Sequence, residues 1–235
     1  MLRVYFGHHK CASQYIKAIF LNATALLGMT PSRVDNFSAE LPLGYHTRAP
    51  FMASLQEHRE RLLTDPAVVW CLTNGDNEAV ALLEQRGAYR GFHVIRDPRD
   101  VLVSAYFSHR YSHPIRAEGS WIAEFRRQLN AAPDIEHGLL LELEFLSNVF
   151  AAMATWHYAN PCVCEARYET LIADPVQEFA RIFRTLEIRT PQLGLTTLAA
   201  IARDRRHTRR HGGSMPLRND PADAVAAAHH RLQRL

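Results

Sequence analysis

Short apolar runs that alternate with helical segments are the feature that most constrains the fold of this chain. Runs typical of buried strands occur at 2–6, 67–72, 91–95 and 161–166. Apolar residues recur at helical spacing at 14–27, 78–85, 98–106, 119–130, 138–159 and 176–186. This order predicts an α/β fold, a three-layer α/β/α domain with a mainly parallel central sheet. Residues 30–60 are mixed, and we expect their three prolines to break up regular structure.

Length and composition fit one globular domain over residues 1–235, without repeats or linkers. The 27 basic and 24 acidic residues leave a net charge of only +3, which is too weak to indicate nucleic-acid binding. No apolar run approaches the roughly 20 residues of a membrane span, and MLRVYFGHHK does not read as a secretory signal. The four cysteines have the pattern of small core residues in a reducing compartment rather than of a zinc site. We therefore expect a cytoplasmic protein.

The segment FGHHKCASQY follows the first strand and opens a helix, which is a common arrangement for binding phosphate. Backbone N–H groups of a helix that starts near Ala12 and Ser13 would point at an anion. Lys10 would add a mobile charge, and the side chains of Ser13 and Gln14 would add hydrogen-bond donors. The alternative is a polar connection with a solvated lysine.

Two further segments concentrate basic residues. Arg96 ends the strand at 91–95, and Asp97 can cap a helix whose first residue is Pro98, with Ser104 two turns later. An ion pair of Arg96 with a nearby carboxylate is the alternative. The run at 203–213 holds five arginines and ends in two glycines, whose backbone can approach a ligand closely. A solvated helix end or an RNA-binding patch is the alternative for this run.

Together these segments resemble the sulfotransferases that use 3′-phosphoadenosine 5′-phosphosulfate (PAPS). Residues 10–15 are similar, position by position, to the family's Lys-Ser-Gly-Thr-Thr-Trp loop for the 5′-phosphosulfate, with Tyr15 in place of the tryptophan near adenine. Residues 92–106 resemble the family's 3′-phosphate motif. Tyr168 lies in a segment similar to the Tyr-Glu-x-Leu near the nucleotide, and residues 210–212 resemble the Arg-Lys-Gly loop over the 3′-phosphate. The resemblance implies a P-loop NTPase-like fold.

The resemblance also implies a reaction, the transfer of a sulfuryl group from PAPS, with PAP as product, to a hydroxyl or amine. Lys10 would stabilise the charge that develops on the oxygen between sulfur and the 5′-phosphate. No metal is expected, because a sulfuryl group carries less negative charge than a phosphoryl group. We expect a small-molecule or glycan acceptor, bound by residues 30–60 and the helices between 110 and 160, and no nucleic-acid partner. The donor would contact Lys10, Cys11, Ala12, Ser13, Gln14, Tyr15, Arg96, Ser104, Tyr168, Arg210, His211 and Gly212.

The general base is the main departure from the family pattern. Many members have a histidine as base where this chain has Asn74, and an amide cannot remove a proton at neutral pH. Asp76 is our candidate for the base, and His46 and His9 are alternatives. The Gly-Asp-Trp that many members have near the C-terminus is replaced by residues 214–217, Ser-Met-Pro-Leu.

Three other functions stay open at this point. A nucleotide kinase or NTPase would need a Gly-Lys-Ser/Thr ending to its phosphate loop, whereas Cys11 follows Lys10 here. A protein that binds PAPS without catalysis would fit the missing histidine. A nucleic-acid binder would use the arginine run.

Overall fold

The structure is a computed structural model, and it describes residues 1–34, 68–72, 77–115 and 120–188. Several residues of the predicted site lie outside this part of the chain. They are His46, Asn74, Asp76, Arg210, His211 and Gly212.

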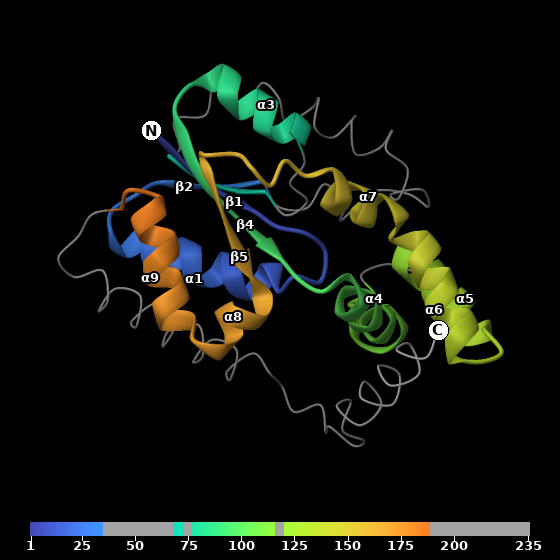
Figure 1. Cartoon of the computed structure of the whole chain (residues 1–235). Helices are drawn as coiled ribbons and strands as arrows, with labels where there is room; N and C mark the ends of the chain where they lie inside the picture. The colour runs from blue at the N-terminus through green and yellow to red at the C-terminus, as the bar shows by residue number, and fades with distance from the viewer. Residues whose placement is uncertain (35–67, 73–76, 116–119, 189–235) are drawn as a thin grey trace.

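Five strands form one sheet in the order β2-β3-β1-β4-β5, and every neighbouring pair is parallel. Their bounds are β1 Leu2–Phe6, β2 Pro31–Val34, β3 Val69–Leu72, β4 Tyr89–Ile95 and β5 Val163–Arg167. The first strand of the chain therefore lies in the middle of the sheet, between β3 and β4 (Figure 1). The predicted α/β fold with a parallel central sheet is confirmed.

Strand β2 corrects the expectation that proline prevents regular structure after residue 30. Pro31 is the first residue of this strand, and the strand lies at the edge of the sheet. At that position a proline is tolerated, because an edge strand has one side without ladder hydrogen bonds.

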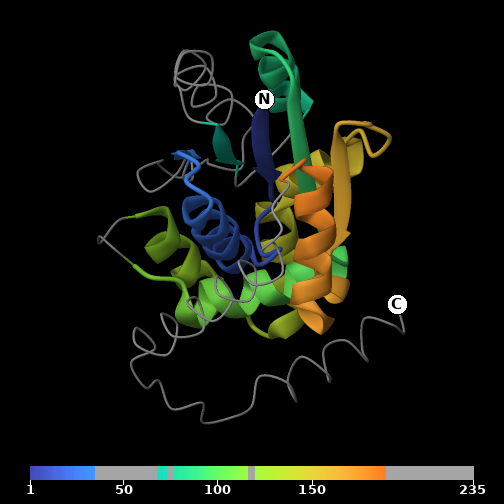
Figure 2. The ribbon, with the colours of Figure 1, turned by 90° about the vertical axis from the view of Figure 1, so that its left-hand side faces the viewer.

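Alternate residues of the strands pack against helices on opposite faces of the sheet. Tyr5 and Phe92 belong to the core cluster that includes residues of α1 (Ser13–Leu26) and α9 (Pro175–Thr185). Val4 and Phe6 belong to a second cluster, with residues of α3 (Asn77–Arg86). Figure 1 shows α3 on one side of the sheet, and Figure 2 looks onto the side where α1 and α9 lie. The three-layer arrangement is thus confirmed.

A third group of helices lies beyond the end of the sheet to which β4 points (Figure 1). Its own core cluster joins α4 (Pro98–Phe107), α5 (Trp121–Ala131) and α6 (Ile135–Phe145). The π-helix η1 (Ser108–Ser112) continues α4 and was not predicted. Chain order brings this group next to the loops that follow the strands, which is where ligands bind in parallel sheets.

Residues 138–159 form two shorter elements rather than the single helix predicted from apolar spacing. Helix α6 ends at Phe145, α7 (Ser147–Thr155) follows, and the two are bent by 56°. Within the residues described, no single helix is long and apolar enough to cross a membrane. Helices α6 and α7 taken together reach the necessary length and apolar composition, but they are bent relative to each other. The last helix before α9 is the short α8 (Tyr168–Ala173), which was also not predicted.

Candidate active site

The loop between β1 and α1 turns sharply because two of its residues adopt left-handed backbone conformations. Lys10 has φ 61° and Ala12 has φ 54°, a region that favours glycine. The Cys11 N–H donates to the His8 carbonyl at 3.2 Å, which closes the turn. Gly7 is needed at its start, since a Cβ there would lie 2.4 Å from the Tyr5 hydroxyl.

The N-terminus of α1 presents backbone donors at the end of this loop. The Ile16 N–H donates to the Ala12 carbonyl at 3.0 Å, so the N–H groups of Ser13 and Gln14 precede the helical ladder. Ala12 occupies the N-cap position and makes no side-chain cap. Donors of this kind, at the positive end of a helix dipole, favour a bound anion.

Arg96 joins this loop to two other strand ends. Its guanidinium donates to the Lys10 carbonyl at 3.0 Å and lies 4.4 Å from the ring centre of Tyr168, the first residue of α8 after β5. The Arg96 Nε is buried and has no hydrogen-bond partner among the described residues. The structure therefore brings Lys10, Arg96 and Tyr168 together, as the sequence predicted, although no contact with a ligand tests their roles.

The electrostatics of the loop favour an anion. The pKa of Lys10 is lowered by burial and by the neighbouring charge of Arg96, while Glu142 opposes this shift. Two partly desolvated cations side by side are stabilised when a negative charge binds between them. Cys11 offers only its backbone to a ligand, because its side chain is fully buried and burial raises the pKa of the thiol to about 12.

The remaining predicted contacts lie on α1 and α4. Asp97 caps α4 by accepting the Arg99 N–H at 2.9 Å, and Pro98 is the first helical residue, as predicted. Ser104 is half-buried on this helix. At the start of α1, Ser13 is half-buried, Gln14 is exposed, and Tyr15 packs against the core.

Two buried histidine–glutamate pairs near the loop were missed by the sequence reasoning. In the first, His109 of η1 contacts Glu142 of α6, with 2.8 Å between Nδ1 and Oε1. The other nitrogen of His109 lies 3.1 Å from Nε2 of His9, the neighbour of Lys10. Burial raises the pKa of Glu142 to about 8, and Lys10 opposes this shift. No sequence signal connects these residues, because Glu142 follows His109 by 33 positions.

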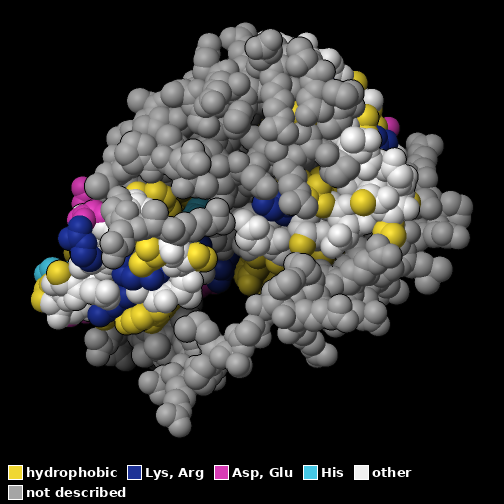
Figure 3. Space-filling view, turned by 180° about the vertical axis from the view of Figure 1, so that it is seen from behind, with side chains coloured by type: hydrophobic (Ala, Val, Ile, Leu, Met, Phe, Trp, Pro, Cys, Tyr) yellow, Lys and Arg dark blue, Asp and Glu magenta, His cyan; other side chains and the backbone are white. Residues whose placement is uncertain are grey.

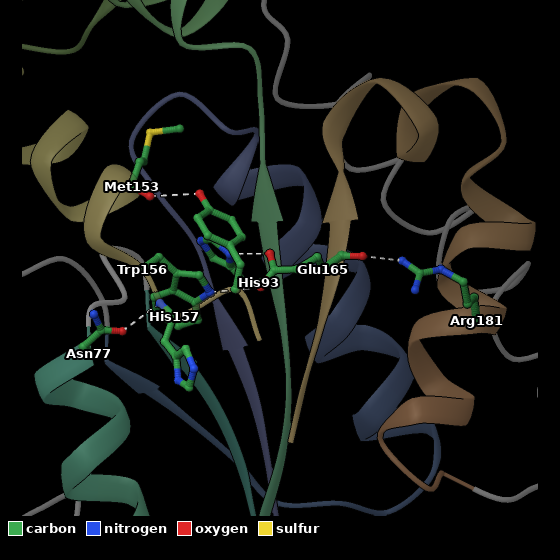
Figure 4. A network of polar contacts seen from close by, with 8 residues as sticks. Asn77, His93, Met153, Trp156, His157, Glu165 and Arg181 are labelled. Atoms are coloured by element: carbon green, nitrogen blue, oxygen red, sulfur yellow. Dashed lines mark hydrogen bonds and ion pairs between the residues drawn. The ribbon is translucent and has the colours of Figure 1, made fainter. Parts of the chain in front are cut away.

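The second pair lies on the sheet itself (Figure 4). His93 of β4 contacts Glu165 of β5 at 2.6 Å, and its ring stacks on Trp156 with 4.2 Å between the ring centres. Trp156 donates to the second oxygen of Glu165 at 2.9 Å, and Arg181 donates to its carbonyl at 2.7 Å. A histidine inside the otherwise apolar run GFHVI is the signal that could have pointed to this pair.

Comparison with known proteins agrees with the resemblance seen in the sequence. Residues 87–202 match the family described as Sulfotransferase domain. Just under half of the chain is thus similar to a sulfotransferase domain. The match begins before Arg96 and extends past α9, so it includes the 3′-phosphate motif and the Tyr168 segment. No curated protein matches the chain.

Solved structures similar to the chain include two complexes with PAP. A mouse sulfotransferase, SULT7A1, complexed with PAP has 15% identity and a TM-score of 0.49 over 92% of this chain. A retinol dehydratase in complex with androsterone and inactive cofactor PAP has 15% identity and a TM-score of 0.45 over 90% of it. The chain spans 66% of the length of each of these two proteins. A sulfotransferase from Alicyclobacillus acidocaldarius has 13% identity and a TM-score of 0.41, with coverage of 86% of this chain and 91% of its own.

Proposed function

We propose that the chain is a PAPS-dependent sulfotransferase, which moves a sulfuryl group to a hydroxyl or amine of a small-molecule or glycan acceptor. The hydrogen bond from Arg96 to the Lys10 carbonyl carries this proposal, because it unites two basic motifs that lie 86 residues apart. PAPS has phosphate at both the 5′ and the 3′ position and therefore needs two neighbouring anion sites, whereas a triphosphate does not need the second.

Each proposed role follows from position and charge. Lys10 stabilises the negative charge that develops on the oxygen between sulfur and the 5′-phosphate. The N–H groups and side chains of Ser13 and Gln14 hold the 5′-phosphate at the N-terminus of α1. Arg96 and Ser104 hold the 3′-phosphate. Because the sulfuryl group carries little charge, positioning and these fixed donors supply most of the catalysis.

Tyr168 fixes the plane of the Arg96 guanidinium through their cation–π contact. A guanidinium held in one plane can bind phosphate through two parallel hydrogen bonds. Cys11, Ala12 and Tyr15 complete the proposed donor site as parts of the loop and of the first turn of α1. Arg210, His211 and Gly212, outside the described residues, belong to the proposal by sequence alone.

A nucleotide kinase or NTPase fits the loop less well. Such a protein places a serine or threonine hydroxyl on magnesium directly after the lysine. Cys11 occupies that position here, and its side chain points into the core. A protein that only binds the donor is the second candidate, and the observation that favours it is Asn74 in place of the usual histidine.

The acceptor is expected beside the helical group that follows Arg96. Among the residues described there, Tyr111 is exposed and Trp121 is half-buried against His113. Seen from behind, basic and hydrophobic side chains lie side by side where α5 and α6 are (Figure 3). This mixture would suit an acceptor that has both an apolar body and polar or acidic groups.

We further propose that the protein is a single cytoplasmic domain without a nucleic-acid partner. All four cysteines are free thiols, which supports a reducing compartment.

Calorimetry with adenosine 3′,5′-bisphosphate (PAP) in the absence of magnesium tests the proposed function. We expect binding by the wild type, loss of binding in Arg96→Ala, and affinity lowered at least about tenfold in Arg96→Lys, because lysine cannot bind phosphate bidentately. Arg99→Ala is the matched control. Its side chain is exposed and pairs with Asp97, so binding should be retained.

Two results would contradict the proposal. One is the absence of PAP binding by the wild type, and the other is binding of ATP that requires magnesium. Turnover of labelled PAPS then separates an enzyme from a binding protein, and turnover that is intact in Lys10→Ala would refute the role of the lysine.

A further inference from the structure

A row of three hydrogen-bonded side chains leads from the phosphate loop into the helical group. It runs from His9 through His109 to Glu142, with separations of 3.1 Å and 2.8 Å between the bonded atoms. The planes of the two histidine rings are inclined by only 20°, with 5.1 Å between the ring centres. We call this row the His9 chain.

The ionised form of Glu142 fixes the direction of every hydrogen bond in the His9 chain. A carboxylate can only accept, so His109 donates to it from Nδ1 and has an acceptor nitrogen at Nε2. His9 must then donate from Nε2 to His109. In this state the neutral ring of His9 carries no proton at Nδ1, which makes that nitrogen a base.

Protonation of Glu142 reverses the same bonds. A neutral carboxyl donates to Nδ1 of His109, His109 donates to Nε2 of His9, and His9 then carries its proton at Nδ1. The buried carboxyl thus controls whether the loop histidine can accept a proton. Such control over a tautomer is the role that the carboxylate has in a catalytic triad.

The burial of Glu142 in the His9 chain lowers the stability of the fold, which suggests that the arrangement has a function. Glu142 is fully buried, and its Oε2 has no hydrogen-bond partner among the described residues. Burying a carboxyl group with one oxygen unpaired costs on the order of 1–3 kcal/mol. His109 lies on a π-helix, an element that often occurs at functional sites. The Arg126 side chain holds the His109 carbonyl at 2.8 Å.

The row is not arranged as a metal site. Within the residues that the structure describes, no group of three or more histidine, cysteine, aspartate or glutamate side chains is placed to hold a metal ion. Aromatic rings surround His109 instead, with centres 5.4 Å away for Phe145, 5.7 Å for Trp121 and 5.8 Å for Phe125. They exclude water from the middle of the chain.

We propose that His9 accepts the proton of the acceptor group during transfer, and that His109 and Glu142 are positioning residues that set His9 in its basic tautomer when Glu142 is ionised. This proposal rests on the proposed function. His9 precedes Lys10 directly, so the base and the lysine at the leaving oxygen belong to the same turn.

The step balances without a further reactant. The acceptor oxygen or nitrogen forms a bond to sulfur, and the bond between sulfur and the 5′-phosphate oxygen breaks, with its electron pair retained by the PAP that leaves. The proton of the acceptor moves to Nδ1 of His9. The positive charge on the imidazole is balanced by Glu142 through His109, and the proton returns to solvent after product release.

Transfer and binding are measured side by side in the first test. Labelled PAPS is incubated with 2-naphthol, and transfer of the label to naphthol is measured. Release of labelled sulfate is measured in the same samples, because water is a second possible acceptor. In His9→Gln we expect transfer to fall roughly 10²–10⁴-fold. Affinity for PAP should stay within about threefold, which also shows that the variant is folded.

Three outcomes would overturn the proposal. The first is full transfer by His9→Gln. The second is loss of transfer in Asp76→Asn but not in His9→Gln, which would make Asp76 the base. The third is a wild type that binds PAP but transfers to neither naphthol nor water. That result would support the proposed donor site and contradict a role of His9 as base. Failure of PAP binding itself would instead refute the proposed function.

The second test uses Glu142→Gln, because a merely structural role would not alter a pH profile. In the wild type we expect transfer to fall as pH decreases through about 8, where Glu142 takes up its proton. Glu142→Gln should lack this step and should transfer at least about tenfold more slowly at high pH. Lys10 faces Glu142 from the loop, with Arg96 beside Lys10, and His113 and Arg126 contact His109 from the helices. These groups are unchanged in the variant.

Glu144→Gln is the matched control, since Glu144 lies on the same helix with its side chain exposed. Its profile should equal that of the wild type. A step near pH 8 that persists in Glu142→Gln would refute the role of Glu142.

Discussion

The two buried histidine–glutamate pairs of this molecule look alike but differ in how fully their hydrogen bonds are satisfied. His93 and His109 are both fully buried, and each contacts its carboxyl through Nδ1. Glu165 accepts a second hydrogen bond, from Trp156, and its side chain is 25% exposed. Glu142 has no such second partner in the described residues and is fully buried.

This difference in hydrogen bonding suggests different roles for the two pairs. Both oxygens of Glu165 have a hydrogen-bond donor, so the His93 pair can serve as a rigid tie between β4, β5 and the end of α7. Glu142 is stabilised in its neutral form, and its pKa is raised to about 8. A group that titrates near physiological pH beside a phosphate loop suits proton transfer rather than support.

The connections of the two pairs differ in the same sense. His109 continues to His9 and hence to Lys10, whereas His93 meets the edge of the buried His8 ring, with 4.8 Å between the ring centres. The pKa of His8 is held well below its usual value by burial and by His93, so His8 stays neutral. We infer that one pair supports the sheet and the other serves the loop.

Removal of His93 is the largest expected effect on stability. His93→Ala would delete the ring that stacks on Trp156 and would leave an oxygen of Glu165 without its donor. We expect the free energy of unfolding to fall by about 3–5 kcal/mol, measured by urea denaturation. The folded fraction should still transfer at the wild-type rate. A loss of transfer without a loss of stability would reverse the assignment of the two pairs.

The pH dependence of stability is the next largest effect. The pKa of Glu142 is about 8 in the folded protein and about 4.5 for the ordinary group, so the folded state holds a proton that the unfolded state releases. Its contribution is therefore complete below about pH 4.5 and is lost as pH rises through about 8. Between pH 5 and 7.5 the free energy of unfolding should decrease by about 3 kcal/mol from this group.

Denaturation of Glu142→Gln over the same pH range measures this contribution, because glutamine does not titrate. Its slope should be flatter than that of the wild type, and Glu144→Gln should keep the wild-type slope. Equal slopes in all three proteins would mean that burial does not raise the pKa of Glu142 in the folded state.

The sequence predicted the parts of this structure that depend on local patterns. The apolar runs identified β1, β3, β4 and β5, and Asp97 with Pro98 marked the start of α4. The loop at Lys10 and the arginine after β4 were placed in one site because the carboxyl ends of parallel strands meet at one edge of a sheet. These inferences need only periodicity and topology.

The sequence could not predict features that depend on packing between distant elements. Pro31 argued against β2, yet the pairing with β3 at the edge of the sheet outweighs that signal. The continuous apolar spacing of residues 138–159 does not show that the helix bends after Phe145. The His9 chain was missed for the same reason, because three elements of different chain position bring its members together.

The loop and the sheet also differ in backbone strain, and this difference gives the smallest expected effect. His93 and Glu165 lie in regular strands, whereas Ala12 has φ 54°, a conformation that costs an alanine roughly 1 kcal/mol relative to glycine. Sulfotransferases that the chain resembles have glycine at this position of the loop. Ala12→Gly should raise the free energy of unfolding by about 0.5–1 kcal/mol in urea denaturation.

Ala25→Gly is the matched control, because Ala25 is exposed within α1 and has no reason to prefer glycine. This second substitution should lower the free energy of unfolding by about 1 kcal/mol, so the same chemical change should have opposite signs at two places 13 residues apart. PAP affinity should stay within about threefold in Ala25→Gly. If Ala12→Gly is destabilising as well, the left-handed turn holds no strain, and the loop is no more strained than the sheet that supports it.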